Sequence, residues 1–88
     1  MDREGVRICK QKLTEMLNYF KEVNVHEIRG SSILFVVSPS TSFYDVKLID
    51  LSSFRPLTDD EGFAYDGITR DQGIIFGLTN ILSMLDQI

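Results

Sequence analysis

The 88-residue sequence contains a single cysteine, Cys9. One thiol cannot form an intrachain disulfide or a cysteine-based zinc cluster, so we expect a reducing location, cytoplasmic or nuclear. Long apolar runs are also missing. The longest, Ile33 to Val37, is far shorter than the ~20 residues that cross a bilayer, and no basic segment followed by an apolar stretch opens the chain. Neither a membrane span nor a signal peptide is expected.

Positive charge is scarce in the second half of the chain. The net charge is −4, and beyond Pro56 the only Lys or Arg is Arg70, set against six acidic residues. Nucleic-acid binding needs a basic face, so no nucleic-acid partner is expected. A hydrophobic fraction of 43% with 25% charged residues is typical of a globular chain. At this length we expect one small domain, residues 1–88.

Helical periodicity is clearest near the N-terminus. From residue 6 to about residue 23, apolar residues recur at spacings of three and four, which predicts an amphipathic helix. Its apolar members are Val6, Cys9, Leu13, Met16, Leu17, Phe20 and Val23. A second such pattern runs from Ile74 to Leu85, preceded by Thr69-Arg70-Asp71-Gln72. That segment fits a capping box with Thr69 as the N-cap and Gln72 reaching back to it.

Two strands are predicted between these helices. Residues 32–38 are rich in β-forming side chains, and their continuous apolar run favours a strand covered on both faces. The turn-forming residues 39–42 separate it from a second strand at 44–51, which predicts an antiparallel hairpin. Residues 52–68 are expected to form a long loop. The predicted class is therefore α+β, in the order helix, hairpin, long loop, helix, with further cover supplied by the parent fold or a second copy.

Two residues could carry chemistry at one end of this hairpin. Asp50 ends the second predicted strand, where an aspartate commonly caps the following turn but can also bind a metal ion. Ser32 begins the first predicted strand, and a hairpin would bring its hydroxyl near Asp50. Mg²⁺ takes only one or two protein oxygens and fills its other positions with water and phosphate oxygens. The pattern allows both the structural and the metal-binding interpretation.

Three segments, in this order, resemble the inositol polyphosphate kinase family. They are Ser31-Ser32-Ile33-Leu34-Phe35, Ile49-Asp50-Leu51 and Asp71-Gln72-Gly73-Ile74-Ile75-Phe76-Gly77-Leu78. The Asp66-Gly67 pair looks most like the inositol hexakisphosphate kinase branch, and the resemblance as a whole is to the inositol hexakisphosphate kinase or inositol polyphosphate multikinase type. The resemblance implies a piece of the C-terminal lobe of an ATP- and Mg-dependent kinase. It implies that Asp50 binds the metal and that Ser32 helps to hold the metal and the nucleotide phosphates.

The chain also departs from this family. The Pro-x-x-x-Asp-x-Lys-x-Gly signature and the lysine-bearing ATP-binding N-lobe are absent, and Leu51 and Ser53 replace a phenylalanine and a basic or histidine residue. We therefore expect a C-terminal segment that is inactive alone, with ATP and an inositol polyphosphate as partners of the complete family fold. The alternative is a non-catalytic α+β binding or dimerisation module, with self-association of this chain.

Overall fold

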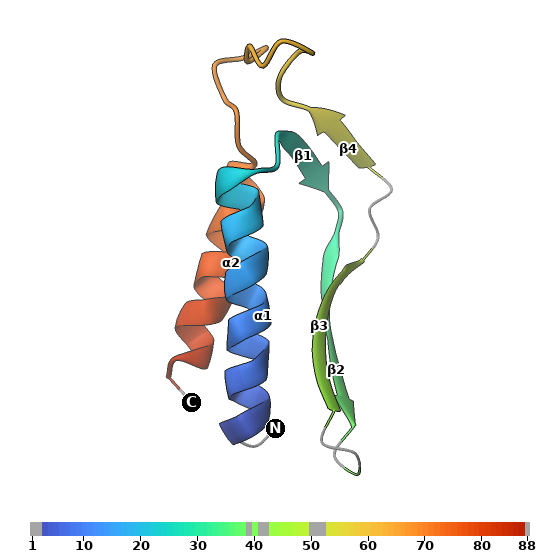
Figure 1. The fold of residues 1–88 in the computed structure, drawn as a ribbon, viewed down its shortest axis with the longest axis vertical. Coiled ribbons are helices and arrows are strands. Elements are labelled where there is room, and N and C mark those ends of the chain that lie inside the picture. The colour runs from blue at the N-terminus through green and yellow to red at the C-terminus, as the bar shows by residue number, and fades with distance from the viewer. Residues whose placement is uncertain (1–2, 39, 41–42, 50–52, 88) are drawn as a thin grey trace.

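The computed structural model describes residues 3–38, 40, 43–49 and 53–87. The element order is α1 (Arg3–Glu22), β1 (His26–Arg29), β2 (Ser32–Ser38), β3 (Phe43–Ile49), β4 (Ser53–Pro56) and α2 (Gln72–Leu85). The two helices lie side by side, and the strands form two hairpin-like pairs stacked along the length of the molecule (Figure 1). The α+β class predicted from the sequence is confirmed. No helix among the described residues is long and apolar enough to cross a membrane.

The predicted hairpin is formed by β2 and β3. They pair antiparallel from Ser32 opposite Ile49 to Ser38 opposite Phe43. The strand predicted at 44–51 is thus confirmed as far as Ile49; Asp50 and Leu51 lie outside the described residues. β-branched and aromatic side chains on both strands explain why this pairing is favoured locally.

The loop predicted at residues 52–68 is wrong in its first part. Residues 53–56 form β4, which pairs antiparallel with β1 so that Arg29 lies opposite Ser53 and His26 opposite Pro56. A four-residue strand that ends in proline carries little β signal of its own. Its partner lies more than 20 positions earlier, so the pairing is a tertiary effect that the local sequence does not show.

The core forms where α1 meets α2 and β3. The buried residues of α1 lie on one face, and they pack with two residues of β3 and one of α2. Together these are Cys9, Leu13, Leu17, Phe20, Tyr44, Val46 and Leu78. The amphipathic helix predicted from residue 6 onward is therefore confirmed, with Cys9 fully buried.

The cover predicted for both faces of β2 is not supplied by the described part of the chain, and cover by the parent fold or by a second copy stays a prediction. Leu34, Phe35 and Val37 remain 43%, 37% and 41% exposed. The physical reason is that the core element α1 packs against β3, while the described residues supply no second layer over the hairpin. The continuous apolar run thus reflects β-forming preference rather than burial within this chain.

Candidate functional site

Ser32 lies at the position predicted for it, at the start of β2. Its Cα is paired with that of Ile49, the residue that precedes Asp50 in the sequence, and Ser32 is exposed. Asp50 itself lies outside the described residues. The antiparallel register is therefore the one that the hypothesis of a shared site requires, while metal binding by Asp50 and Ser32 stays a prediction.

Metal centres built from several acidic, histidine or cysteine ligands are not found in the described part of the chain. No group of three or more such side chains is placed to hold an ion there. A Mg²⁺ ion that bridges to phosphate oxygens needs fewer protein ligands than this criterion demands. The exposed hydroxyl of Ser32 suits such a sparse site, because it is open to a ligand and to water.

A two-residue turn just before Ser32 joins the β1–β4 pair to the β2–β3 pair. β1 ends at Arg29 and the chain turns through Gly30 and Ser31 into β2. Gly30 has φ 71°, a left-handed conformation that a residue with a Cβ adopts only with strain. This turn sets Ser32 only three residues from Arg29, and Arg29 in turn lies opposite Ser53, the first residue of β4.

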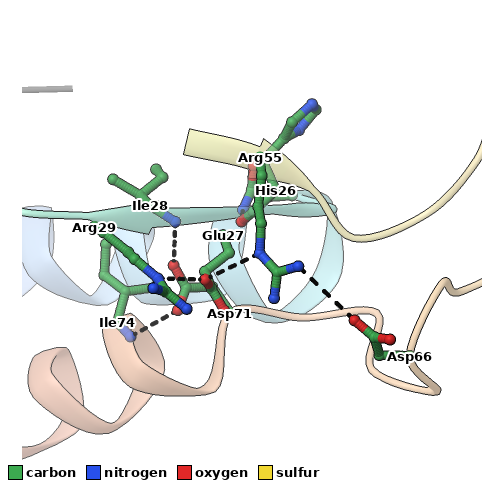
Figure 2. Close-up of polar contacts among 9 residues, drawn as sticks. His26, Glu27, Ile28, Arg29, Arg55, Asp66, Asp71 and Ile74 are labelled. Atoms are coloured by element: carbon green, nitrogen blue, oxygen red, sulfur yellow. Dashed lines mark hydrogen bonds and ion pairs between the residues drawn. The ribbon is translucent and has the colours of Figure 1, made fainter. Parts of the chain in front are cut away.

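A polar cluster occupies one face of the β1–β4 pair (Figure 2). The guanidinium of Arg29 donates through Nε to Glu27 Oε1 at 2.6 Å, and that of Arg55 donates through Nε to the same oxygen at 3.2 Å. Arg55 Nη1 also lies 3.8 Å from Asp66 Oδ2. These hydrogen bonds, first from Arg55 and then from Arg29, lower the pKa of the Glu27 carboxyl below its ordinary value. Glu27 therefore stays ionised and holds both guanidiniums.

The opposite face of the same strand pair is apolar. The rings of His26 and Phe54 meet edge to face with centroids 5.7 Å apart, next to Ile28. Alternation along each strand explains the division, because successive side chains point to opposite faces. Phe54 nevertheless remains 63% exposed, so the described residues leave this apolar face largely open.

Asp71 is a buried carboxylate that joins two distant elements. Its Oδ2 accepts a hydrogen bond from Ile28 N of β1 at 2.8 Å, and its Oδ1 accepts one from Ile74 N of α2 at 3.2 Å (Figure 2). Asp71 is therefore the N-cap of α2, and the N-cap predicted at Thr69 is wrong. Thr69 and Asp71 are both good N-cap residues, and the second contact with β1 explains why Asp71 is used.

Arg70, next to this cap, fastens the same end of α2 to α1. Its guanidinium donates to the carbonyl oxygens of Lys21 at 2.7 Å and Glu22 at 3.0 Å. These carbonyls belong to the last turn of α1, where a cation is favoured by the unpaired acceptors and the helix dipole. The pair Arg70-Asp71 therefore connects α1, β1 and α2 at one point, a role that the sequence pattern did not predict.

A groove of about 440 Å³ runs between the strands and α2. Its lining combines aliphatic side chains with Asp71 and with Glu27 and Arg29 of the polar cluster. The main apolar lining residues are Ile28, Ile33, Leu48, Ile74, Leu78 and Ile81. Ser31 also lines it, so the segment between β1 and β2 borders both this groove and the polar cluster.

Comparison with known proteins agrees with the resemblance drawn from the sequence. The family model of the inositol polyphosphate kinases matches residues 2–86, nearly the whole chain. The chain therefore belongs to the inositol polyphosphate kinase family, and so to a class of phosphate-transferring proteins that act on inositol phosphates. No curated protein and no solved structure shows a significant match to the chain.

Proposed function

We propose that this chain is the C-terminal segment of the catalytic lobe of an ATP- and Mg-dependent inositol polyphosphate kinase, and that it supplies the metal-binding residues Asp50 and Ser32. The observation that carries the proposal is the family match over residues 2–86. The register of β2 and β3, which sets Ser32 opposite Ile49, supports it. The strand pair fixes the backbone of Ser32, and Asp50 follows Ile49 directly in the sequence.

The chemistry expected of this pair follows from the ligands that Mg²⁺ prefers. A carboxylate at Asp50 and a hydroxyl at Ser32 are hard oxygen donors, which suit Mg²⁺ bound to nucleotide phosphates. The ion, when bound, neutralises charge on the phosphates during transfer. Ser32 can serve either as a ligand or as a hydrogen-bond donor to a phosphate oxygen, because its hydroxyl can do both.

We further propose that these 88 residues do not transfer phosphate by themselves. Phosphoryl transfer depends on cations and donors positioned around the phosphates, and on a residue that activates the acceptor. The sequence lacks the Pro-x-x-x-Asp-x-Lys-x-Gly signature that the family uses, and its net charge is −4. ATP and an inositol polyphosphate are therefore proposed as ligands of the complete family fold.

A cytoplasmic or nuclear location is proposed from the single cysteine.

The test is a titration of the ¹⁵N-labelled chain with ATP in the presence and absence of Mg²⁺. We expect Mg-dependent shifts of the Ser32 and Ile49 amides that are lost in Asp50→Asn and weakened in Ser32→Ala. Asp60→Asn and Ser83→Ala are the matched controls, because both residues are exposed and neither belongs to the β2–β3 hairpin. Shifts that are identical in Asp50→Asn and wild type would refute metal binding at Asp50. Turnover of an inositol phosphate by the wild-type chain, lost in Asp50→Asn, would refute inactivity.

One observation favours the second candidate, a non-catalytic binding or dimerisation module. Several large apolar side chains are more than 60% exposed, among them Phe54, Phe63, Tyr65 and Phe76. Exposed apolar surface of this kind is common at protein interfaces. A defined dimer in sedimentation equilibrium, together with no response to Mg-ATP, would favour the module over the kinase segment.

A further inference from the structure

The strongest unassigned feature is the pair of guanidiniums on the β1–β4 sheet. Arg29 and Arg55 lie 26 positions apart in the sequence and meet only because β1 and β4 pair. Each uses Nε to bind the same oxygen of Glu27, which sets the two groups side by side. Their Nη atoms are left for other partners: no described residue accepts from those of Arg29, and Arg55 Nη1 has only the longer ion pair with Asp66.

This arrangement gathers two cations in an acidic chain. The two guanidiniums and the Glu27 carboxylate sum to +1, and Asp66, 3.8 Å from Arg55 Nη1, brings the sum to zero until a ligand displaces it. Their mutual hydrogen bond lowers the pKa of Glu27 and raises that of Arg55, so both groups of this pair stay ionised. The arginine side chains are 72% and 53% exposed, whereas that of Glu27 is only 24% exposed. The cations therefore face solvent, and the anion that orients them lies beneath. Guanidinium forks match phosphate oxygens in pairs.

A hollow that could hold a phosphorylated ligand lies beside Arg29 and Arg55. It measures about 410 Å³ and is lined by Glu27, Arg29, Phe54 and Arg55. It also lies next to the candidate metal site along the chain, because Arg29 precedes Ser32 by three residues and β4 begins three residues after Asp50.

We propose that Arg29 and Arg55, oriented by Glu27, form a metal-independent binding site for clustered phosphate groups. The clustered phosphates could belong to a nucleotide triphosphate or to a polyphosphorylated inositol. The identity of this ligand rests on the proposed kinase function, but the binding itself does not. The site requires only the β1–β4 pairing and neither Asp50 nor Mg²⁺. Asp66 competes with the ligand for Arg55.

The test is isothermal titration of the 88-residue chain with sodium tripolyphosphate in EDTA. We expect Arg29→Gln and Arg55→Gln each to weaken binding about tenfold, the effect of losing one charge-assisted hydrogen bond. Asp66→Asn should strengthen binding, because it removes the competing carboxylate. Arg7→Gln is the matched control, since Arg7 is an exposed arginine that also pairs with a nearby glutamate, Glu4.

Two further titrations identify the source of the phosphates. In EDTA, tighter binding of inositol hexakisphosphate than of ATP assigns the site to the phosphorylated inositol, and the reverse assigns it to the nucleotide. Asp50→Asn should leave tripolyphosphate binding intact, so failure of the metal site and failure of this site give different results. Thermal melts of each variant establish that it is folded, and Arg29→Lys should retain part of the affinity.

The proposal is overturned if folded Arg29→Gln and Arg55→Gln bind tripolyphosphate as tightly as Arg7→Gln. It is also overturned if the wild-type chain does not bind tripolyphosphate in EDTA at low ionic strength, where contacts between charged groups are strongest.

Discussion

Removing the carboxylate of Asp71 should destabilise the fold more than removing any other acidic side chain in the described part of the chain. Asp71 is 4% exposed and accepts hydrogen bonds from the backbone of both Ile28 and Ile74. Loss of an N-cap costs about 1 kcal/mol. A buried backbone N–H left without its acceptor costs about 1–3 kcal/mol more. We therefore expect Asp71→Ala to lower the free energy of unfolding by about 2–4 kcal/mol.

That loss is large for a chain of this size, whose total stability should be about 4–13 kcal/mol. Asp71→Asn should cost less than Asp71→Ala, because its amide oxygen can still accept one of the two hydrogen bonds. Urea unfolding followed by circular dichroism measures both values. Thr69→Ala and Asp60→Ala are the controls, and each should change stability by less than about 0.5 kcal/mol. Hydrogen exchange adds a local measurement, since the Ile28 amide should lose protection in Asp71→Ala.

Two results would refute this reasoning. A cost below about 0.5 kcal/mol for Asp71→Ala would mean that neither hydrogen bond contributes to stability. A larger cost for Thr69→Ala than for Asp71→Ala would mean that α2 begins with the capping box expected from the sequence. Unchanged exchange at Ile28 would locate the contribution of Asp71 in α2 alone and would remove its link to β1.

Two more predictions concern buried and paired ionisable groups. Burial raises the pKa of the fully buried Cys9 thiol. Ellman's reagent should therefore label the native protein only as fast as the structure opens. Labelling of Cys9 at the rate of a free thiol would contradict this prediction. The Lys12 ammonium, followed by the Val46 backbone N–H, lowers the pKa of Asp45. The carboxyl of Asp45 therefore binds fewer protons in the native state than in the unfolded state, where the pKa of an aspartate is about 3.9. The stabilisation from Asp45 is fully present above that pH, and it is lost as the pH falls through the lower pKa of the folded state. The melting temperature should fall on acidification less steeply in Asp45→Asn than in wild type, and parallel curves would contradict the assignment.

The parts of the fold that the sequence predicted are those whose signals are local. The spacing of Cys9, Leu13 and Leu17 identifies α1 without knowledge of its neighbours, and the runs on either side of residues 39–42 identify the β2–β3 hairpin. β4 was missed because residues 53–56 become a strand only through pairing with β1. The N-cap of α2 was misplaced by two residues because the deciding contact, with Ile28, comes from another element.

The candidate site divides in the same way. Asp50 and Ser32 could be proposed from short motifs, because each lies within a segment that resembles a known family. The grouping of Arg29, Arg55 and Glu27 could not, because it depends on the register of two strands that are separated by a complete hairpin. The net charge of the chain suggested a shortage of cations, whereas the pairing of β1 with β4 brings Arg29 and Arg55 together on one face of that strand pair.

The segments that resemble this family lie in different surroundings in the structure. Among the described residues, the side chains of Arg70 and Asp71 hydrogen-bond to backbone groups of α1, β1 and α2 and to the carbonyl oxygen of Thr69, so the start of the last motif holds the fold together. Ser32 and Arg29 face solvent near the junction of the two strand pairs, where a ligand can reach them. Substitutions at the two places should therefore have opposite signatures. Changes at Asp71 should act on stability first, and changes at Arg29 should act on phosphate affinity while stability stays nearly constant.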